Sequence, residues 1–208
     1  MRLTKVLALI AVVALAVPLA NAADTKHKFS FGLGYFMPTD DYSETVDEYT
    51  ITMEADDAIG YGLGYEYYHN ELMSFAASIW FADHDVTIDV PDELTVLAEY
   101  DYGSVAWMPI LFDANFHVLK GKPVDLYLGP TLGYSMWDDW EFEGDTQKIK
   151  DQFVYGLNFG LDVPFAENWA FTAGLRYLFV EAEPDEDDSG DAIGVDPLVL
   201  TVGIGYKF

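Results

Sequence analysis

The sequence predicts an all-β protein, a transmembrane antiparallel β-barrel of eight strands with up-and-down topology. Two observations support this prediction. Eight segments alternate large apolar side chains with small or polar ones at period two, which is typical of strands that separate two different environments. The connections between these segments alternate between short turns and long acidic stretches, as they do in barrels that span an outer membrane.

The N-terminal residues predict an export signal. Two basic residues precede an apolar run over residues 6–17, and Ala-Asn-Ala follows at 20–22 as a small-residue cleavage site. The apolar run is shorter than the roughly 20 residues that a transmembrane helix needs. We therefore expect residues 1–22 to be a signal peptide that is removed during export through the general secretory pathway. Residues 23–208 would then form one outer-membrane β-barrel domain.

The first four predicted strands carry large apolar side chains on one face. From Phe29 to Tyr35, every second residue is large and apolar, and the residues between are Ser and Gly. From Ile59 to Tyr67, the residues between the large ones are mostly Gly. Met73 to Phe81 alternates mostly with Ser and Ala. The fourth strand, Ile110 to Val118, presents polar groups on its second face. In each strand the two faces therefore differ in size and polarity, as a membrane-spanning strand requires.

The last four predicted strands repeat this pattern. In three of them, large and mostly apolar residues alternate with residues that include Gly: Leu126 to Tyr134, Phe153 to Leu161 and Trp169 to Tyr177. In the final strand, Leu198 to Phe208, six large apolar side chains share one face, and no helix follows that could cover them. That face must meet lipid or a partner. Short turns are expected at 69–71, 119–123 and 166–168.

The acidic residues are concentrated in four blocks, which are expected to be long loops. The blocks cover residues 40–57, 83–101, 138–151 and 181–196 and hold 29 of the 36 acids. The chain has a net charge of −26, which argues against nucleic acid as a partner. It contains no Cys, so disulfides contribute nothing to its stability.

Physical chemistry requires the predicted sheet to close. Backbone groups cannot stay unpaired in lipid, so a spanning sheet has no free edge. Tyr67, Trp169 and Tyr206 at strand ends suit an interfacial aromatic girdle. The large faces would then point outward and the small faces would fill a narrow lumen. The alternative is a soluble barrel of lipocalin type with the large side chains inside, which would leave a surface of mostly Gly, Ala and Ser.

The C-terminal half resembles the OmpW family. Asp-Pro-Leu at 196–198 runs into Gly-Tyr-Lys-Phe at 205–208, and Pro109 precedes a strand that ends at His117, followed by Val-Asp-Leu-Tyr-Leu-Gly-Pro at 124–130. The resemblance covers roughly residues 105 to 208. It implies an eight-stranded barrel with a narrow, largely apolar interior that passes small hydrophobic compounds. The heavily acidic loops are not part of this resemblance.

Two groups of side chains are expected inside the lumen. An apolar group would line it mostly toward the loop end: Phe36, Trp80, Trp107, Tyr127, Trp137 and Leu178. A charged group would project inward as a network, mostly nearer the short turns: Glu66, Asp113, His117, Asp125, Asp162, Arg176 and Lys207. A charge in a desolvated lumen needs a partner, and Asp113 is one candidate partner for Arg176. The aromatic group either forms a vestibule for ligands or simply packs the lumen.

No motif for catalysis or for a tightly bound cofactor is apparent. None of the four His residues has a Ser two positions away on the same strand face, so we expect no enzyme activity. One acidic block partly matches a calcium loop, although strands rather than helices flank it. Its candidate ligands are Asp185, Asp187, Ser189, Asp191 and Asp196. We expect at most weak Ca²⁺ or Mg²⁺ binding at the acidic loops.

Two functional hypotheses follow. The first is a narrow conduit or binding barrel for small hydrophobic molecules. The second is a closed structural or surface-interaction barrel that acts through its acidic extracellular loops. Both place the chain in the bacterial outer membrane, with membrane lipid and lipopolysaccharide as partners, and the first adds a small hydrophobic ligand.

Overall fold

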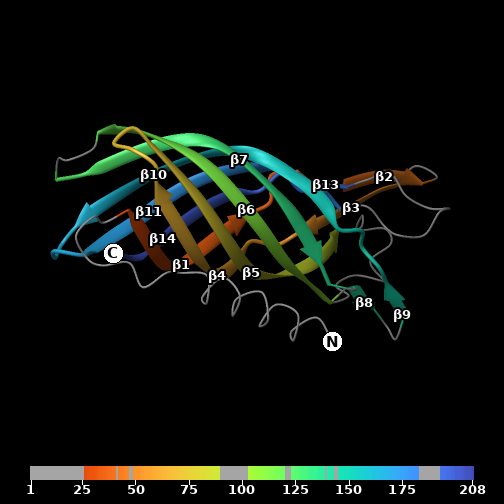
Figure 1. The fold of residues 1–208 in the computed structure, drawn as a ribbon. Coiled ribbons are helices and arrows are strands. Elements are labelled where there is room, and N and C mark those ends of the chain that lie inside the picture. The colour runs from red at the N-terminus through yellow and green to blue at the C-terminus, as the bar shows by residue number, and fades with distance from the viewer. Residues whose placement is uncertain are drawn as a thin grey trace.

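The computed structural model describes residues 26–40, 42–46, 49–89, 103–119, 123–138, 140–142, 145–182 and 193–208. The regular secondary structure of these residues consists of β-strands, and every strand pairing is antiparallel (Figure 1). Within them, no helix is long and apolar enough to cross a membrane. The predicted signal peptide lies outside the described residues, so its cleavage stays a prediction.

Eight strands form a closed barrel, which confirms the predicted fold class. They are β1 (His27–Met37), β4 (Ala58–Tyr68), β5 (Met73–Asp89), β6 (Ser104–Leu119), β7 (Asp125–Trp137), β10 (Gln152–Pro164), β11 (Trp169–Phe179) and β14 (Leu198–Lys207). Around the barrel the order is β6, β5, β4, β1, β14, β11, β10 and β7, and β7 pairs with β6 to close it. Seven of these strands contain a predicted segment in full, and β14 ends one residue before the predicted end at Phe208.

The prediction that the acidic blocks are loops throughout was wrong. Short strands form within three of them: β2 (Tyr42–Val46), β3 (Tyr49–Ala55), β8 (Trp140–Phe142), β9 (Asp145–Gln147), β12 (Glu181–Ala182) and β13 (Ile193–Gly194). In the fourth block, β5 continues to Asp89 and pairs with β3 beyond the barrel. Thr and Ile are neighbours in β3 and at the end of β5, and β-branched residues favour strands even where acidic residues lie beside them. The strands project from the loop end of the barrel (Figure 1).

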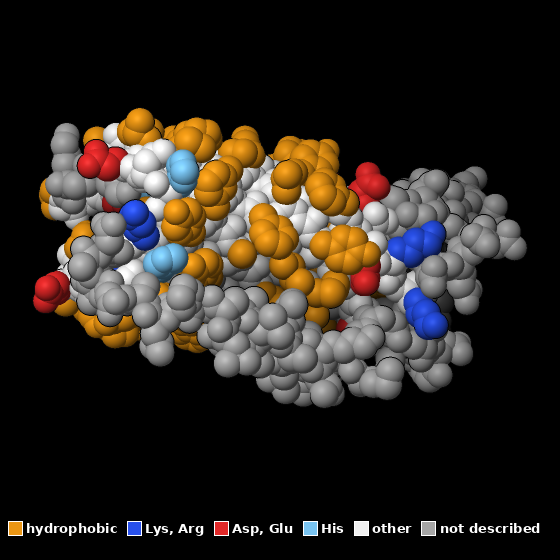
Figure 2. Space-filling view, in the orientation of Figure 1, with side chains coloured by type: hydrophobic (Ala, Val, Ile, Leu, Met, Phe, Trp, Pro, Cys, Tyr) orange, Lys and Arg blue, Asp and Glu red, His pale blue; other side chains and the backbone are white. Residues whose placement is uncertain are grey.

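The large apolar faces point outward, which contradicts the soluble alternative with its apolar interior. Leu157 and Val202 lie in the middle of their strands and are 65% and 62% exposed. Figure 2 shows hydrophobic side chains along the middle of the molecule and charged side chains toward its two ends. The inward faces are small enough for opposite walls to approach. Both Cα partners of Gly32, for example, are glycines, Gly62 and Gly203.

Candidate functional site

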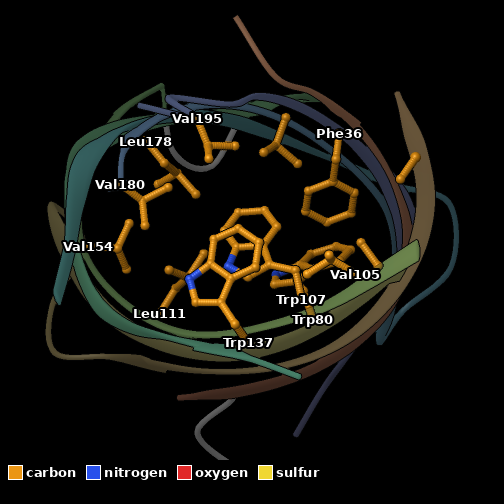
Figure 3. Close-up of a cluster of buried hydrophobic side chains, with 13 residues drawn as sticks. Phe36, Trp80, Val105, Trp107, Leu111, Trp137, Val154, Leu178, Val180 and Val195 are labelled. Atoms are coloured by element: carbon orange, nitrogen blue, oxygen red, sulfur yellow. The ribbon is translucent and has the colours of Figure 1, made fainter. Parts of the chain in front are cut away.

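The loop half of the lumen is filled by apolar side chains. This apolar cluster consists of Phe36, Ala58, Trp80, Ala82, Val105, Trp107, Leu111, Trp137, Val154, Leu178, Val180, Val195 and Val199. Figure 3 shows its labelled side chains pointing from the barrel wall into the lumen. The indoles of Trp107 and Trp137 stack with centroids 5.4 Å apart, and the Phe36 ring meets Trp107 edge-on at 5.6 Å. The cluster contains five of the six apolar residues expected to line the lumen.

Trp80 forms the boundary of the apolar cluster on the side of the short turns. Its indole Nε1 donates to Ser78 Oγ at 3.2 Å, and the guanidinium carbon of Arg176 lies 5.9 Å from its ring centroid. The ring lies against the bare backbone of Gly62, where an added Cβ would be 2.4 Å from the indole Cδ2. The absent side chain at Gly62 thus makes the space that the indole occupies.

Adding that side chain is expected to displace Trp80. Overpacking typically costs about 1–3 kcal/mol, so Gly62→Ala should lower the free energy of unfolding by this amount and change the near-ultraviolet circular dichroism of the indoles. Gly205→Ala is the matched control, because the atoms nearest to its Cβ would be side-chain atoms at 3.0 Å or more. Equal losses in the two variants would contradict this account of Trp80 packing.

On the side of Trp80 that faces away from the apolar cluster, Arg176 forms a partly buried ion pair. Its Nη2 lies 2.7 Å from Asp113 Oδ2, so the partner put forward from the sequence is the one the structure places there. The other oxygen, Asp113 Oδ1, accepts a hydrogen bond from Thr131 Oγ1 at 2.6 Å. Asn158 Nδ2 donates to the carbonyl of Gly129 at 3.0 Å. The guanidinium is therefore anchored on the β6 and β7 side of the lumen.

The turn half of the lumen is closed by a chain of polar contacts, which we call the polar ring. Its members are Lys28, Glu66, Ser74, His117, Asp125, Asp162 and Lys207, from seven of the eight barrel strands. Lys28 is central, because its Nζ lies 2.6 Å from Glu66 Oε2 and 2.8 Å from Asp162 Oδ2. Lys207 Nζ is 3.6 Å from the same Asp162 oxygen. The backbones of Asp125 and Asp162 are paired in register, so the chain of contacts returns to its start.

His117 links two parts of the polar ring. Its Nδ1 lies 2.8 Å from Asp125 Oδ1, and its Nε2 lies 2.8 Å from Ser74 Oγ. The same hydroxyl contacts Glu66 Oε1. If Glu66 is ionised, it must accept the single Ser74 proton. The Ser74 oxygen can then accept a hydrogen bond from His117 Nε2, so the ring connects Ser74 with Asp125.

The hydroxyl beside His117 comes from another strand, so it was not evident from the strand face of His117. Ser74 comes from the neighbouring strand β5, and together with Asp125 it forms a Ser-His-Asp arrangement that only the register reveals. The Ser74 side chain has no solvent exposure, so a substrate carbonyl has no access to its hydroxyl. The arrangement holds the polar ring together, and the absence of enzyme activity stays a prediction.

Two residues of the interior differ from the sequence expectation. Tyr127 was grouped with the apolar lining toward the loop end, but its ring lies 5.5 Å from Lys28 Nζ and 5.5 Å from the His117 ring, at the polar ring. Tyr127 lies only two residues after the start of β7, which explains its position near the turn. Lys28 itself was missed, because the first strand was expected to begin at Phe29. Lys28 lies two residues before Ser30 and four before Gly32, on the same strand face, and this spacing indicated that it points inward.

A cavity of about 80 Å³, which we call the central cavity, separates the apolar cluster from the polar ring. Trp80 and Arg176 border it on one side, and Lys28, Glu66 and Tyr127 border it on the other. Its walls consist of small side chains, including Ser30, Gly32, Gly64, Ala76, Ser78 and Thr172. The lumen is thus ordered along its axis as an apolar cluster, a small polar cavity and a closed polar ring.

Comparison with protein families identifies the architecture. The chain matches the family described as "Outer membrane protein beta-barrel domain" over residues 7–208. The chain belongs to this family. A search of curated proteins finds no significant match.

Solved outer-membrane β-barrels share the fold. OprG from Pseudomonas aeruginosa is similar with a TM-score of 0.72 at 17% identity, covering 88% of this chain and 96% of OprG. AlkL, solved in DMPC lipid bilayers, has a TM-score of 0.63 at 16% identity, covering 91% and 94%. The E. coli outer membrane protein W has a TM-score of 0.54 at 16% identity, covering 90% and 100%. The resemblance to the OmpW family is therefore confirmed as a likeness of fold.

Membership of the outer-membrane β-barrel family orients the site. In such barrels the short turns lie on the periplasmic side and the long loops lie outside. The polar ring is therefore at the periplasmic end and the apolar cluster at the extracellular end. Tyr206 lies beside Trp169 next to the short turn, with ring centroids 4.9 Å apart and planes tilted by 58°, as expected of an aromatic girdle.

The calcium-loop candidates lie mostly outside the described residues, as Asp185, Asp187, Ser189 and Asp191 do. Asp196 is described, and its Oδ1 accepts a hydrogen bond from the Val180 backbone N–H at 2.9 Å. It adopts a positive φ of 30°. Among the described residues no group of three or more His, Asp or Glu is arranged to hold a metal ion. Metal binding at the loops stays a prediction.

Proposed function

We propose that this outer-membrane barrel binds small hydrophobic molecules in the apolar cluster, at the extracellular end of its lumen. The observation that carries the proposal is the order of the layers, with an apolar cluster toward the loops and a closed polar ring behind it. An apolar molecule gains roughly 25 cal/mol for each Å² that it buries among such side chains. The resemblance to the OmpW family implies the same class of ligand.

The polar ring favours a binding barrel over a straight conduit. A molecule that moved on to the periplasm would have to separate Lys28 from Glu66 and Asp162, which are all buried. Breaking such pairs leaves uncompensated charges and costs several kcal/mol. The polar ring is therefore a barrier to apolar molecules and to ions, and the ligand stays on the extracellular side of it.

Tryptophan quenching tests the proposal. Bromooctane, an apolar molecule with a quenching bromine, is titrated into vesicles that contain the barrel. Trp169 faces outward and Trp140 lies in β8, so each is first replaced by Phe. We expect saturable quenching of the remaining indoles, which belong to Trp80, Trp107 and Trp137 in the apolar cluster.

A pair of variants on one strand provides the control. Val199 is 2% exposed within the apolar cluster, whereas Val202 on the same strand is 62% exposed on the outer face. Val199→Phe adds volume within the packed apolar cluster and should abolish saturation, and Val202→Phe should leave it unchanged. If the parent barrel shows no saturable quenching, the binding function is refuted. The chain would then act as a closed barrel through its extracellular loops.

A further inference from the structure

The central cavity has polar lining that the binding of a purely apolar molecule does not use. Among the described residues, Trp80 alone belongs both to its lining and to the apolar cluster. A molecule held in the cluster is therefore separated from the cavity by a single indole. The indole is held by a hydrogen bond to Ser78 and by packing against Gly62 and the Phe36 ring, and its rotation would join the two spaces.

Two polar atoms at the central cavity lack a hydrogen-bond partner among the described residues. Arg176 Nε is a donor, while Nη2 of the same group is engaged by Asp113. Asn115 Oδ1 is an acceptor, while Nδ2 of the same amide donates to Glu66 at 3.1 Å. Both residues line the cavity, and Asn115 is 3% exposed. Buried polar atoms are nearly always paired, so an unpaired donor and an unpaired acceptor at one cavity point to a ligand.

The charges that line the central cavity are balanced. Lys28 and Arg176 are opposed by Glu66 and Asp113, and each cation is already paired with a carboxylate. A charged ligand would have to break one of these pairs, which is costly in a buried site. The lining therefore favours a neutral group over a carboxylate or an ammonium ion.

We propose that the central cavity binds the hydroxyl head group of a small alcohol whose apolar tail lies in the apolar cluster. A hydroxyl is neutral, accepts from Arg176 Nε and donates to Asn115 Oδ1, so it satisfies both free atoms. An alkane satisfies neither atom, and a carboxylate has no hydrogen to donate. A cavity of about 80 Å³ has room for the hydroxyl and its first methylene groups, not for the tail. This inference rests on the proposed function and specifies its ligand class.

The only arginines of the chain, Arg2 and Arg176, make the test direct. Arg2 lies in the expected signal peptide, so the barrel purified from outer membranes should give one arginine Nε–H signal by NMR. Arg176→Lys verifies the assignment by removing that signal. The barrel, labelled with ¹⁵N-arginine and ¹⁵N-tryptophan in lipid nanodiscs, is titrated with 1-octanol, octane and octanoate. The indole signals report the tail, and the Arg176 signal reports the head group.

We expect each of the three molecules that binds to shift the indole signals. Only 1-octanol should also shift the Arg176 signal saturably. Its affinity should exceed those of octane and octanoate by about tenfold or more, because each free buried atom gains a partner. Asn115→Leu should abolish the advantage over octane. Asn168→Leu, a change at an amide in a short turn that does not line the cavity, should retain it.

The outcomes separate this inference from the function on which it rests. Saturable indole shifts with equal affinities for octane and 1-octanol, and an unmoved Arg176 signal, would overturn the hydroxyl site and leave apolar binding intact. The cavity would then hold water only. Tighter binding of octanoate would show an anion site instead and also overturn the inference. Indole signals that respond to none of the three ligands would refute the proposed function itself.

Discussion

Replacing Lys28 with Met is expected to lower the free energy of unfolding of the barrel by about 3–5 kcal/mol. The side chain is 4% exposed, and its Nζ contacts Glu66 and Asp162, which are buried as well. Met keeps most of the volume of the lysine stem but leaves both carboxylates without their main counter-charge. Equilibrium unfolding by guanidinium chloride of the barrel in lipid vesicles measures the loss.

Two controls make this prediction specific. Lys26→Met changes an exposed lysine two residues earlier and should alter the stability by less than about 0.5 kcal/mol. In the triple variant Lys28→Met, Glu66→Gln and Asp162→Asn, the unpaired charges are removed together, and most of the lost stability should return. If the triple variant is as unstable as Lys28→Met, the loss comes from packing and the charge argument fails.

Arginine on the outer face is expected to be costly at mid-membrane only. Val202 lies in the middle of β14 and faces outward, so Val202→Arg should cost about 2–4 kcal/mol, the penalty of a cation at the bilayer midplane. Val118 also faces outward, at 57% exposure, but it lies one residue from the end of β6 near a short turn. There the lipid headgroups accept a charge, and Val118→Arg should cost about 0–1 kcal/mol.

Folding in vesicles, followed by the heat-modifiable shift in gel mobility and by unfolding titrations, compares these two variants. They share the same substitution and similar exposure, so only depth in the membrane differs. A penalty of the same size at both positions would mean that the outer face does not span the bilayer as the strands suggest.

The eight barrel strands could be predicted because a membrane barrel imposes its environment on every second residue. The alternation from Leu198 to Phe208 needs no tertiary information to interpret. The same reasoning placed Trp107, Trp137 and Leu178 inside the lumen. It failed for the short strand β3, because the acidic residues around it obscured the alternation of Thr with Ile and Met.

Contacts across the lumen could not be predicted, because they depend on strand tilt and register. Lys28 and Asp162 are separated by 134 positions in the chain and meet only through the shear of the closed sheet. Ser74 and His117 meet through the pairing of β5 with β6. The pairing of Arg176 with Asp113 could be suggested, because an inward arginine needs a carboxylate, but the sequence alone offered several.

The polar ring also determines which barrel the chain can form. Each of its side chains comes from a different strand, and a slip of one residue at any seam turns a whole strand over, so that its inward residues face lipid. A sheet closed with the wrong offset would then expose Lys28, Asp162 or Asp125 to hydrocarbon, or leave the others without partners. Such closures are disfavoured by several kcal/mol for each charge that is exposed to hydrocarbon. The ring therefore acts as a check on assembly, and its contribution lies in rejecting misaligned barrels more than in stabilising the correct one.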